Sequence, residues 1–239
     1  MNIVVDVGNT FTKVGIFEND TLQGKEVFDA VGELQKFLFR TPAENLLISS
    51  VTIGVNEMTS WSIATGLKII LHPELPLPIQ NRYTTPTTLG VDRLAAACGA
   101  KLTFPDQDCL VVDIGTCINY EFINKTGEYL GGAISPGVRM RFEAMHRYTA
   151  KLPLAPATEA PLLIGDATIS CLQSGVMNGM CEEINGIIQR YDIQYPGIRV
   201  ILSGGDAPFF ENHLNPTIFV APDLVLIGLN SILLHNVAL

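Results

Sequence analysis

Two apolar runs of the chain end in the same polar signature. Residues 3–10 read IVVDVGNT and residues 110–117 read LVVDIGTC. An apolar, β-branched run of this length is typical of a buried strand, and a glycine two residues after the carboxylate permits a tight turn. A second apolar segment follows each turn, so each copy predicts a β-hairpin with a carboxylate, Asp6 or Asp113, near its tip.

One hairpin of this kind would be explained by an ordinary surface turn rich in Asp, Gly and Asn. Its repetition favours a chain of two related halves, which we expect to be an N-terminal lobe of residues 1–108 and a C-terminal lobe of residues 109–239. Turn amides hydrogen-bond phosphate oxygens, and carboxylates hold cations that neutralise phosphate charge. Two such loops facing a shared cleft would therefore suit a phosphorylated ligand.

The rest of the pattern alternates between strand and helix, which indicates an α/β layer architecture. Helical spacing of apolar residues is clearest where Pro42 ends one segment and where an Ala-rich stretch follows Asp92. The glycine-rich residues 131–137 are expected to be a connection, and residues 149–165 a surface loop. The expected helices are residues 30–40, 56–66, 94–101, 138–148, 168–190 and 224–234, and the further strands are residues 46–51, 67–71 and 200–202.

A Pro-rich segment delivers Tyr83 and then Gly90, Val91, Asp92 and Arg93 to the start of the Ala-rich helix. An Asp at a helix start is commonly only a cap or a partner of the helix dipole, and an Arg beside it commonly forms a surface ion pair. A long irregular loop that brings Tyr, Gly, Asp and Arg together also resembles a substrate-binding segment. Both interpretations stay open on the residues alone.

Composition excludes several classes of protein. The 239 residues are 47% hydrophobic and 16% charged, which supports a substantial core. A formal net charge of −9 argues against general binding to nucleic acid or to an anionic membrane surface. No apolar stretch reaches about 18 residues, so we expect no membrane span. A short first apolar run without a signal-peptide pattern and an odd number of cysteines, five, favour a reduced, cytoplasmic protein.

Several common sites are absent from the sequence. It contains neither a P-loop motif nor a Gly-x-Gly-x-x-Gly fingerprint, and its four histidines are too scattered for a zinc site. Cys117 follows the second Asp-x-Gly turn, where a small apolar filler is favoured over a nucleophile.

In their order and spacing, the remaining motifs resemble those of the type III pantothenate kinases, a branch of the acetate and sugar kinase/actin-like superfamily. The resemblance covers nearly the whole chain. It is carried by Asp6-Val7-Gly8-Asn9-Thr10 with Lys13, Tyr83, Gly90-Val91-Asp92-Arg93, Asp113-Ile114-Gly115-Thr116, Gly131-Gly132-Ala133-Ile134-Ser135-Pro136-Gly137, Gly165 with Thr168, and Ser203-Gly204-Gly205-Asp206.

The resemblance implies an α/β fold of two related actin-like (ribonuclease H-like) lobes, with mixed sheets flanked by helices and the active site in the cleft between them. It implies ATP-dependent phosphorylation of pantothenate to 4′-phosphopantothenate, the first step of coenzyme A biosynthesis. It also implies a homodimer, with the helix that carries Thr168 near the partner subunit.

The family's residue roles, carried over by motif, give an expected site. Asp92 would be the proton acceptor, and Asp113 would hold a monovalent cation, K⁺ or NH4⁺, beside the Mg²⁺ that accompanies ATP. The expected ATP-binding residues are Asp6, Val7, Gly8, Asn9, Thr10, Phe11, Thr12, Lys13 and Thr116. The expected pantothenate-binding residues are Tyr83, Gly90, Val91, Asp92, Arg93 and Thr168. Arg93 could pair with the substrate carboxylate, because its planar fork matches that group.

One departure affects the cation site. Many relatives have Thr and Asp on the strand after the second turn, where this chain has Asn119 and Glu121. Two other functions stay open: a kinase of another small alcohol, or a phosphohydrolase, on the same scaffold, and a nucleotide-binding regulator that has lost turnover.

Overall fold

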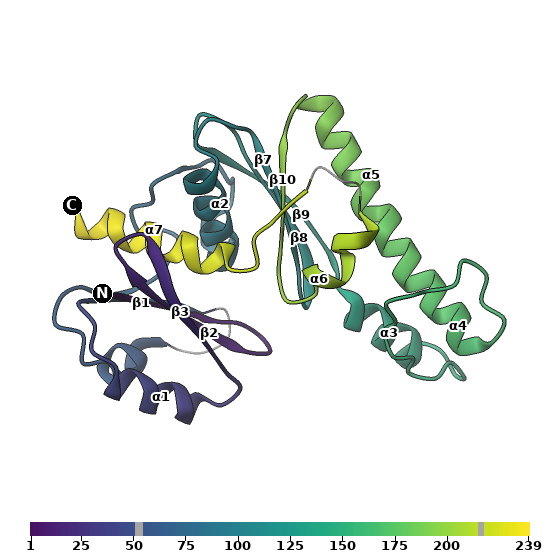
Figure 1. Ribbon diagram of the computed structural model, residues 1–239, viewed down its shortest axis with the longest axis horizontal. Helices are drawn as coiled ribbons and strands as arrows, with labels where there is room; N and C mark the ends of the chain where they lie inside the picture. The colour runs from purple at the N-terminus through teal and green to yellow at the C-terminus, as the bar shows by residue number, and fades with distance from the viewer. Residues whose placement is uncertain (51–54, 215–217) are drawn as a thin grey trace. The chain divides into compact units, whose positions relative to one another are not determined.

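The computed structural model describes residues 1–50, 55–214 and 218–239 of the chain. These residues form two compact units (Figure 1). The first unit contains Met1–Gln107, Glu121–Gly131 and Asp223–Leu239, and the second contains Asp108–Tyr120 and Gly132–Pro222. Two segments from the later half of the chain thus belong to the first unit. The lobe boundary at residues 108 and 109 stays a prediction.

The first unit is built on a mixed sheet whose described strands follow the order β3-β2-β1-β4-β5. Strands β1, β2 and β3 are consecutive and antiparallel, whereas β4 and β5 join on the other side of β1 in parallel pairs. The predicted first hairpin is therefore confirmed. The strands are β1 Asn2–Val7, β2 Thr12–Glu18, β3 Thr21–Phe28, β4 Asn45–Ser50 and β5 Lys68–Ile70.

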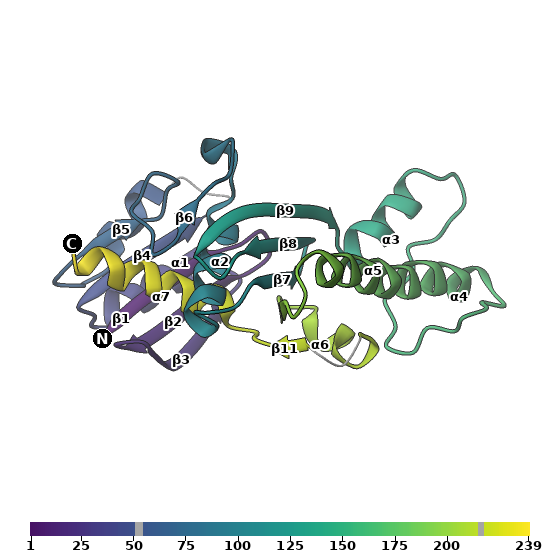
Figure 2. The ribbon, with the colours of Figure 1, turned by 90° about the horizontal axis from the view of Figure 1, so that it is seen from above.

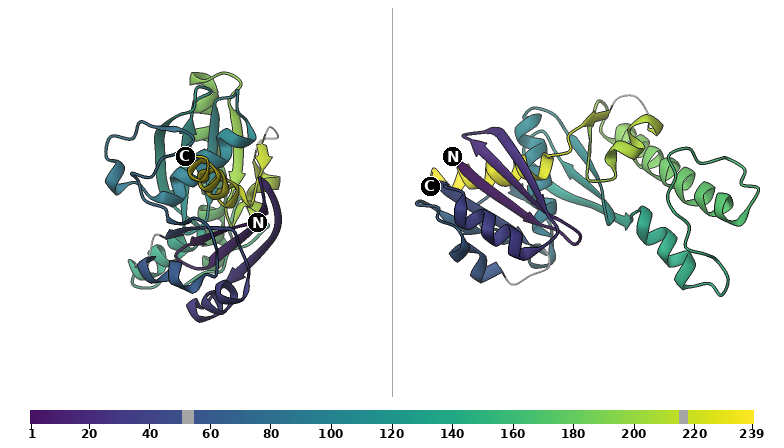
Figure 3. Two further views of the ribbon diagram at one scale, coloured as in Figure 1. Left: turned by 90° about the vertical axis from the view of Figure 1, so that its left-hand side faces the viewer. Right: turned by 60° about the horizontal axis from the view of Figure 1, so that its bottom comes forward.

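Helices cover both faces of this sheet, α1 on one side and α2 with α7 on the other (Figures 1 and 3). Leu34 and Leu38 of α1 are buried against Ile3 and Val5 of β1, because alternate residues of a strand face the same side. Helices α2 and α7 pack side by side. The helical elements of this unit are α1 Val31–Arg40, the 3₁₀ helices Val55–Trp61 and Pro86–Thr88, α2 Val91–Thr103 and α7 Leu224–Val237.

The second sheet repeats the connectivity of the first. Its described strands follow the order β11-β10-β7-β8-β9-β6, so β9-β8-β7-β10-β11 corresponds to β3-β2-β1-β4-β5. Strands β7, β10 and β11 pair in parallel. The duplicated order agrees with the two Asp-x-Gly hairpins in the sequence. The strands are β6 Gln80–Asn81, β7 Cys109–Ile114, β8 Cys117–Ile123, β9 Glu128–Pro136, β10 Arg199–Ser203 and β11 Ile218–Val220.

A long helical rod covers the core of the second unit. Helices α4 and α5 continue along one axis (Figure 2) and bury Leu172, Val176, Met180 and Ile184 on one face. This is the stripe that the sequence predicts for residues 168–190. The helical elements of this unit are α3 Val138–Arg147, α4 Thr168–Gln173, a π-helical turn at Ser174–Asn178, α5 Gly179–Gln194, α6 Ala207–Phe210 and a 3₁₀ turn at Glu211–His213.

Three sequence predictions need correction. The glycine-rich residues 131–136 are not a connection, because they continue strand β9, where strand pairing outweighs the low strand propensity of glycine. The helix expected over residues 56–66 is a 3₁₀ helix that ends at Trp61. The helix expected over residues 168–190 is interrupted by the π-helical turn and runs on to Gln194. Val51, at the end of a predicted strand, lies outside the described residues.

None of the described helices is both long and apolar enough to span a membrane. The cytoplasmic location expected from the sequence stays a prediction.

Candidate functional site

The first predicted phosphate-binding loop connects β1 to β2. Asp6 lies opposite Lys13 in the antiparallel register, and the backbone N–H of Gly8 donates to the Phe11 carbonyl at 3.1 Å. Asn9, Thr10 and Phe11 of this turn are exposed. Val7 and Thr12 are buried, so these two expected ATP-binding residues would offer a ligand only backbone groups. The loop therefore presents amides and polar side chains, with one carboxylate and one ammonium group at its base.

A second group of predicted residues lies at the start of α2. The Oδ1 atom of Asp92 accepts the backbone N–H of Arg93 at 3.0 Å. A methyl group on Gly90 would lie 2.5 Å from that same oxygen, so a glycine here leaves room for the carboxylate. Burial raises the pKa of Asp92, although the amide hydrogen bonds and Arg93 oppose the shift. The result is a partly buried carboxylate that binds a proton more readily than an ordinary aspartate does.

Arg93 does not form the surface ion pair that was one interpretation of the sequence. Its side chain is only 8% exposed, and it pairs with Glu121 of β8, whose side chain is 1% exposed. Nε of Arg93 donates to Oε1 of Glu121 at 2.6 Å, and Nη2 donates to Oε2 at 3.0 Å. The planar fork of Arg93 is thus already occupied by a carboxylate of the protein. Its pairing with a substrate carboxylate stays a prediction.

Two tyrosines complete this cluster. The hydroxyl of the fully buried Tyr129 donates to Oε2 of Glu121 at 2.5 Å. The ring of Tyr83 stacks on that of Tyr129 at a centroid distance of 6.3 Å, and lies 5.6 Å from the guanidinium carbon of Arg93. Gly131 adopts a φ of +98°, and a Cβ there would lie 3.0 Å from the Tyr83 ring. The first unit therefore brings Tyr83, Asp92 and Arg93 together.

In the second unit, the loop after Asp113 is held by close backbone contacts. Gly137 N–H donates to the Thr116 carbonyl at 3.1 Å, and Asp206 N–H donates to the Ile114 carbonyl at 3.0 Å. Gly204 has a φ of +96°, and a Cβ there would lie 2.5 Å from Oδ1 of Asp113. Gly137, Gly204 and Asp206 of the later motifs thus meet the turn that follows Asp113, while the Thr116 side chain is exposed.

The residues around Asp113 suit a hard cation. The carboxylate of Asp113 is an oxygen donor of the kind that potassium and other hard cations prefer, whereas the Ile114 and Thr116 carbonyls each accept a backbone N–H. Among the described residues, no group of three or more His, Cys, Asp or Glu side chains is gathered for a metal ion. Glu121, the departure noted in the sequence, has both carboxylate oxygens engaged by Arg93 and Tyr129.

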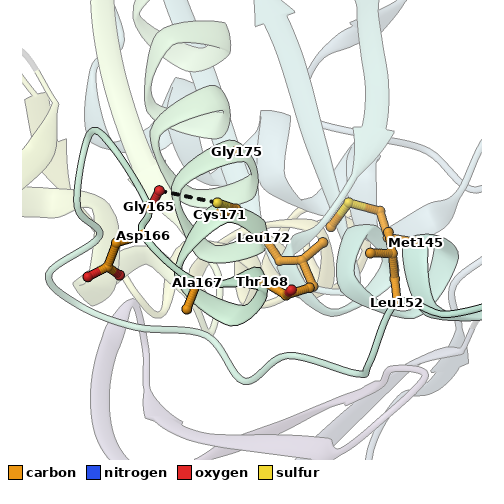
Figure 4. Close-up of a pocket in the computed structure, with 9 residues that line it drawn as sticks. All are labelled: Met145, Leu152, Gly165, Asp166, Ala167, Thr168, Cys171, Leu172 and Gly175. Carbon is orange, nitrogen blue, oxygen red and sulfur yellow. Dashed lines mark hydrogen bonds between the residues drawn. The ribbon is translucent and has the colours of Figure 1, made fainter.

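Thr168, the remaining predicted residue, begins α4 and lines a cavity of about 560 Å³ in the second unit (Figure 4). Leu172 of the same helix, with Met145 and Leu152, makes one part of its wall apolar. Cys171 lies near the Gly165 carbonyl at 3.3 Å, which closes the loop before the helix (Figure 4). The cavity combines an exposed hydroxyl with an apolar lining.

Sequence reasoning missed the hydrogen bonds that join Glu121 to Arg93 and Tyr129. Glu121 was visible as a departure from the family pattern, but its partner Arg93 is 28 residues away in the chain. For Tyr129, we found no signal in the sequence.

Comparison with known proteins identifies the family. The family described as "Type III pantothenate kinase" matches residues 2–190 of the chain. A type III pantothenate kinase of Cytophaga hutchinsonii is 42% identical over 238 residues, which span 99% of this chain and 100% of that protein. A type III pantothenate kinase of Flavobacterium johnsoniae is 40% identical over 235 residues, 96% of each protein.

Solved structures support the fold. A Campylobacter jejuni protein assigned to the Baf family of transcriptional activators aligns with a TM-score of 0.67 at 20% identity, over 99% of this chain and 100% of that one. The activator of the 2-hydroxyisocaproyl-CoA dehydratase from Clostridium difficile, with bound ADPNP, aligns with a TM-score of 0.55 at 12% identity, over 98% and 93%. At these identities the likeness concerns the fold alone. The family match and the full-length relatives go further, and they show that this chain belongs to the type III pantothenate kinases.

Proposed function

We propose that the protein transfers the γ-phosphoryl group of ATP to the primary alcohol of pantothenate and releases 4′-phosphopantothenate and ADP. Membership of the family supports this activity. The structural observation that supports it best is the partly buried Asp92 carboxylate at the start of α2, with its raised pKa and Arg93 beside it. A desolvated carboxylate in such a setting suits proton transfer.

ATP would be held by the two glycine turns. Residues 6–13 offer turn amides, hydroxyl groups and Lys13 for phosphate oxygens, and Thr116 offers an exposed hydroxyl in the second unit. Mg²⁺ bound with the nucleotide would supply further neutralisation of phosphate charge. Asp113 would hold the monovalent cation, K⁺ or NH4⁺.

Pantothenate would be bound by Tyr83, the residues from Gly90 to Arg93, and Thr168. Gly90 and Val91 would contribute through the backbone at the start of α2, since Gly90 has no side chain and Val91 is buried. The apolar lining beside Thr168 suits the dimethyl part of pantothenate.

The chemical step depends on positioning and charge. The alcohol oxygen of pantothenate attacks the γ-phosphorus, the bond from phosphorus to the β–γ bridging oxygen breaks, and ADP leaves with that oxygen. The alcohol proton passes to Asp92 as the new bond forms. Phosphoryl transfer needs little covalent participation by the protein, so correct placement of these groups carries most of the catalysis.

Two other functions would be compatible with the same fold: catalysis on another substrate, and regulation without turnover. A kinase of another small alcohol, or a phosphohydrolase, would use the same loops with a different acceptor. A nucleotide-binding regulator would retain the fold without turnover. The presence of Asp6, Asp92, Asp113 and Thr116 argues for turnover.

An ADP-release assay tests the proposal. We expect ADP release from ATP and Mg²⁺ to depend on pantothenate, and to be faster in potassium than in sodium, because oxygen donors set for the larger ion coordinate sodium poorly. A panel of other small alcohols is the control for acceptor specificity. ATP binding without pantothenate-dependent ADP release would favour the regulator. Equal rates in potassium and in sodium would contradict the proposed potassium site at Asp113.

We further propose that the protein is a homodimer in which the segment around Thr168 lies near the partner subunit. Leu163 and Ile164, just before α4, are 85% and 82% exposed, which is unusual for neighbouring large apolar side chains. Light scattering should give twice the chain mass of 26.0 kDa. Replacing both residues by serine should shift the protein toward monomer, with serine at exposed Ile193 as the control; a monomeric mass for the unmodified protein would contradict the dimer.

A further inference from the structure

Three of the proposed substrate-site residues are tied to two residues that the family motifs do not assign. Arg93 is held by the carboxylate of Glu121, and Glu121 is held in turn by the Tyr129 hydroxyl. Tyr83 lies against both Arg93 and Tyr129. Asp92 is attached to the same unit through the Arg93 amide. All five residues belong to the first unit.

We propose that Glu121 and Tyr129 are positioning residues. Glu121 holds the Arg93 guanidinium by two hydrogen bonds, and Tyr129 holds Glu121 by a third. Together they set the orientation and the electrostatic environment of the Asp92 carboxylate. This inference rests on the proposed function, since it concerns the group that accepts the alcohol proton. Neither residue is assigned a contact with substrate, so their role is exerted through Arg93.

The geometry of the Arg93–Glu121 pair indicates a role beyond stabilising the fold. A buried ion pair contributes little net stability compared with apolar residues of the same shape, because both charges must be desolvated. Here the pair is bidentate, with a third hydrogen bond from Tyr129 on the same carboxylate. These three hydrogen bonds hold the Arg93 side chain in one orientation. Asp92 precedes Arg93 in the chain, so its backbone is held in place as well.

The charged groups around Asp92 predict a measurable effect of Glu121 on the pKa of Asp92. The charged and titratable groups of this cluster are Arg93 on α2, Glu121 on β8, Tyr129 on β9 and Tyr83 in the preceding loop. Burial raises the pKa of both carboxyls, and Arg93 lowers both. The like charge of Asp92 raises the pKa of Glu121 further, and repulsion between two like charges is mutual. Removing the charge of Glu121 while keeping Arg93 should therefore lower the pKa of Asp92.

Glu121→Gln and Tyr129→Phe are the test variants. Glu121→Gln keeps the shape and one acceptor but removes the charge, and Tyr129→Phe removes only the hydroxyl that donates to Glu121. We expect turnover with pantothenate to fall about 10- to 100-fold in Glu121→Gln, with the KM for ATP unchanged, because misplaced reacting groups cost rate more than binding. The pH at which turnover falls on the acid side of the pH profile should move to a lower value, which a merely structural role would not cause. Glu121→Asp should restore that pH to its value in the unmodified protein.

Matched controls make the same chemical changes elsewhere. Glu128→Gln removes a carboxylate that pairs with Arg82 on the surface at 2.9 Å, and Tyr120→Phe removes a buried hydroxyl 3.4 Å from Glu183. Both controls should leave turnover within about twofold and the pH profile unchanged, because neither pair lies in the cluster.

Titration of the Asp92 carboxyl by carbon NMR, assigned with Asp92→Asn, separates this inference from the proposed function. A lower Asp92 pKa in Glu121→Gln supports the network even if the protein has no pantothenate kinase activity, which would refute only the function. An unchanged Asp92 pKa in Glu121→Gln would contradict the proposed positioning role of Glu121. If Glu121→Gln does not fold, Tyr129→Phe decides by turnover and pH profile, and values equal to those of the unmodified protein overturn the role.

Discussion

Replacing Asp92 by asparagine is expected to lower turnover with pantothenate by about 10²- to 10⁴-fold, the usual contribution of a positioned base. The substitution keeps the shape of the side chain, and its amide oxygen can still accept the Arg93 N–H that Asp92 accepts at 3.0 Å. It removes the atom that would take the alcohol proton. ATP affinity should stay unchanged, because the nucleotide is assigned to other residues.

The same variant should be at least as stable as the unmodified protein. Burial raises the folded-state pKa of Asp92 above its ordinary value, so the stability that its protonated form contributes at low pH is lost as pH rises through the raised pKa. At neutral pH the folded protein therefore carries a desolvated carboxylate, and asparagine removes that cost. For the same reason, turnover of the unmodified protein should fall as pH drops through the raised pKa.

Turnover and ATP binding, measured side by side by ADP release and calorimetry, check this prediction. Asp20→Asn, in the exposed turn between β2 and β3, is the control and should change neither. Near-normal turnover in Asp92→Asn would remove Asp92 from the role of proton acceptor, whereas loss of ATP binding would show that the site had been disrupted more widely.

Replacing Gly228 by alanine is expected to destabilise the protein by about 3 kcal/mol, the upper part of the range for overpacking. Helices α2 and α7 meet backbone to backbone at this point. A methyl group on Gly228 would overlap the Ala95 carbonyl oxygen, and would lie 2.6 Å from its carbon and 2.8 Å from the Gly99 nitrogen. Backbone atoms inside a helix cannot move aside singly, so the two helices would have to separate.

Gly32→Ala provides the control in the same unit, because a Cβ on Gly32 of α1 would meet nothing within 4 Å. Alanine there should change stability by less than about 1 kcal/mol, toward a more stable protein. The shift of the denaturation midpoint measures both variants. Equal midpoints for the two would mean that α2 and α7 do not approach each other as described. Since α2 also carries Asp92, any remaining folded Gly228→Ala protein should lose activity.

Much of the fold could be predicted because its strongest signals are local. The runs before Asp6 and Asp113 are continuous and β-branched, and they form the buried strands β1 and β7. The stripe of α4 and α5 repeats with helical spacing. By contrast, strand β3, Thr21–Phe28, was not predicted, because it is an edge strand with mostly exposed, polar residues. The glycine-rich part of strand β9 was not predicted as a strand, because glycine has a low strand propensity that pairing with the preceding strand β8 outweighs.

The motifs suggested which residues form the candidate site, but they did not indicate the contacts among those residues. The position of Asp92 at a helix start followed from the residues around it. The bond between Arg93 and Glu121 joins a helix to a strand far along the chain, and no pattern in the sequence specifies that meeting. The sequence suggested that Arg93 pairs with a substrate carboxylate, which stays a prediction, but it did not indicate the pairing of Arg93 with Glu121 that the structure shows.

The most direct test of the account is to incubate the purified protein with pantothenate, Mg²⁺ and ATP labelled in the γ-phosphoryl group, and to follow the label by mass spectrometry. We expect the label in 4′-phosphopantothenate, formed in equal amount to ADP, with its formation almost abolished in Asp92→Asn. Label found only in inorganic phosphate would contradict the account, as would preferred labelling of another small alcohol when a panel of alcohols is added together with pantothenate.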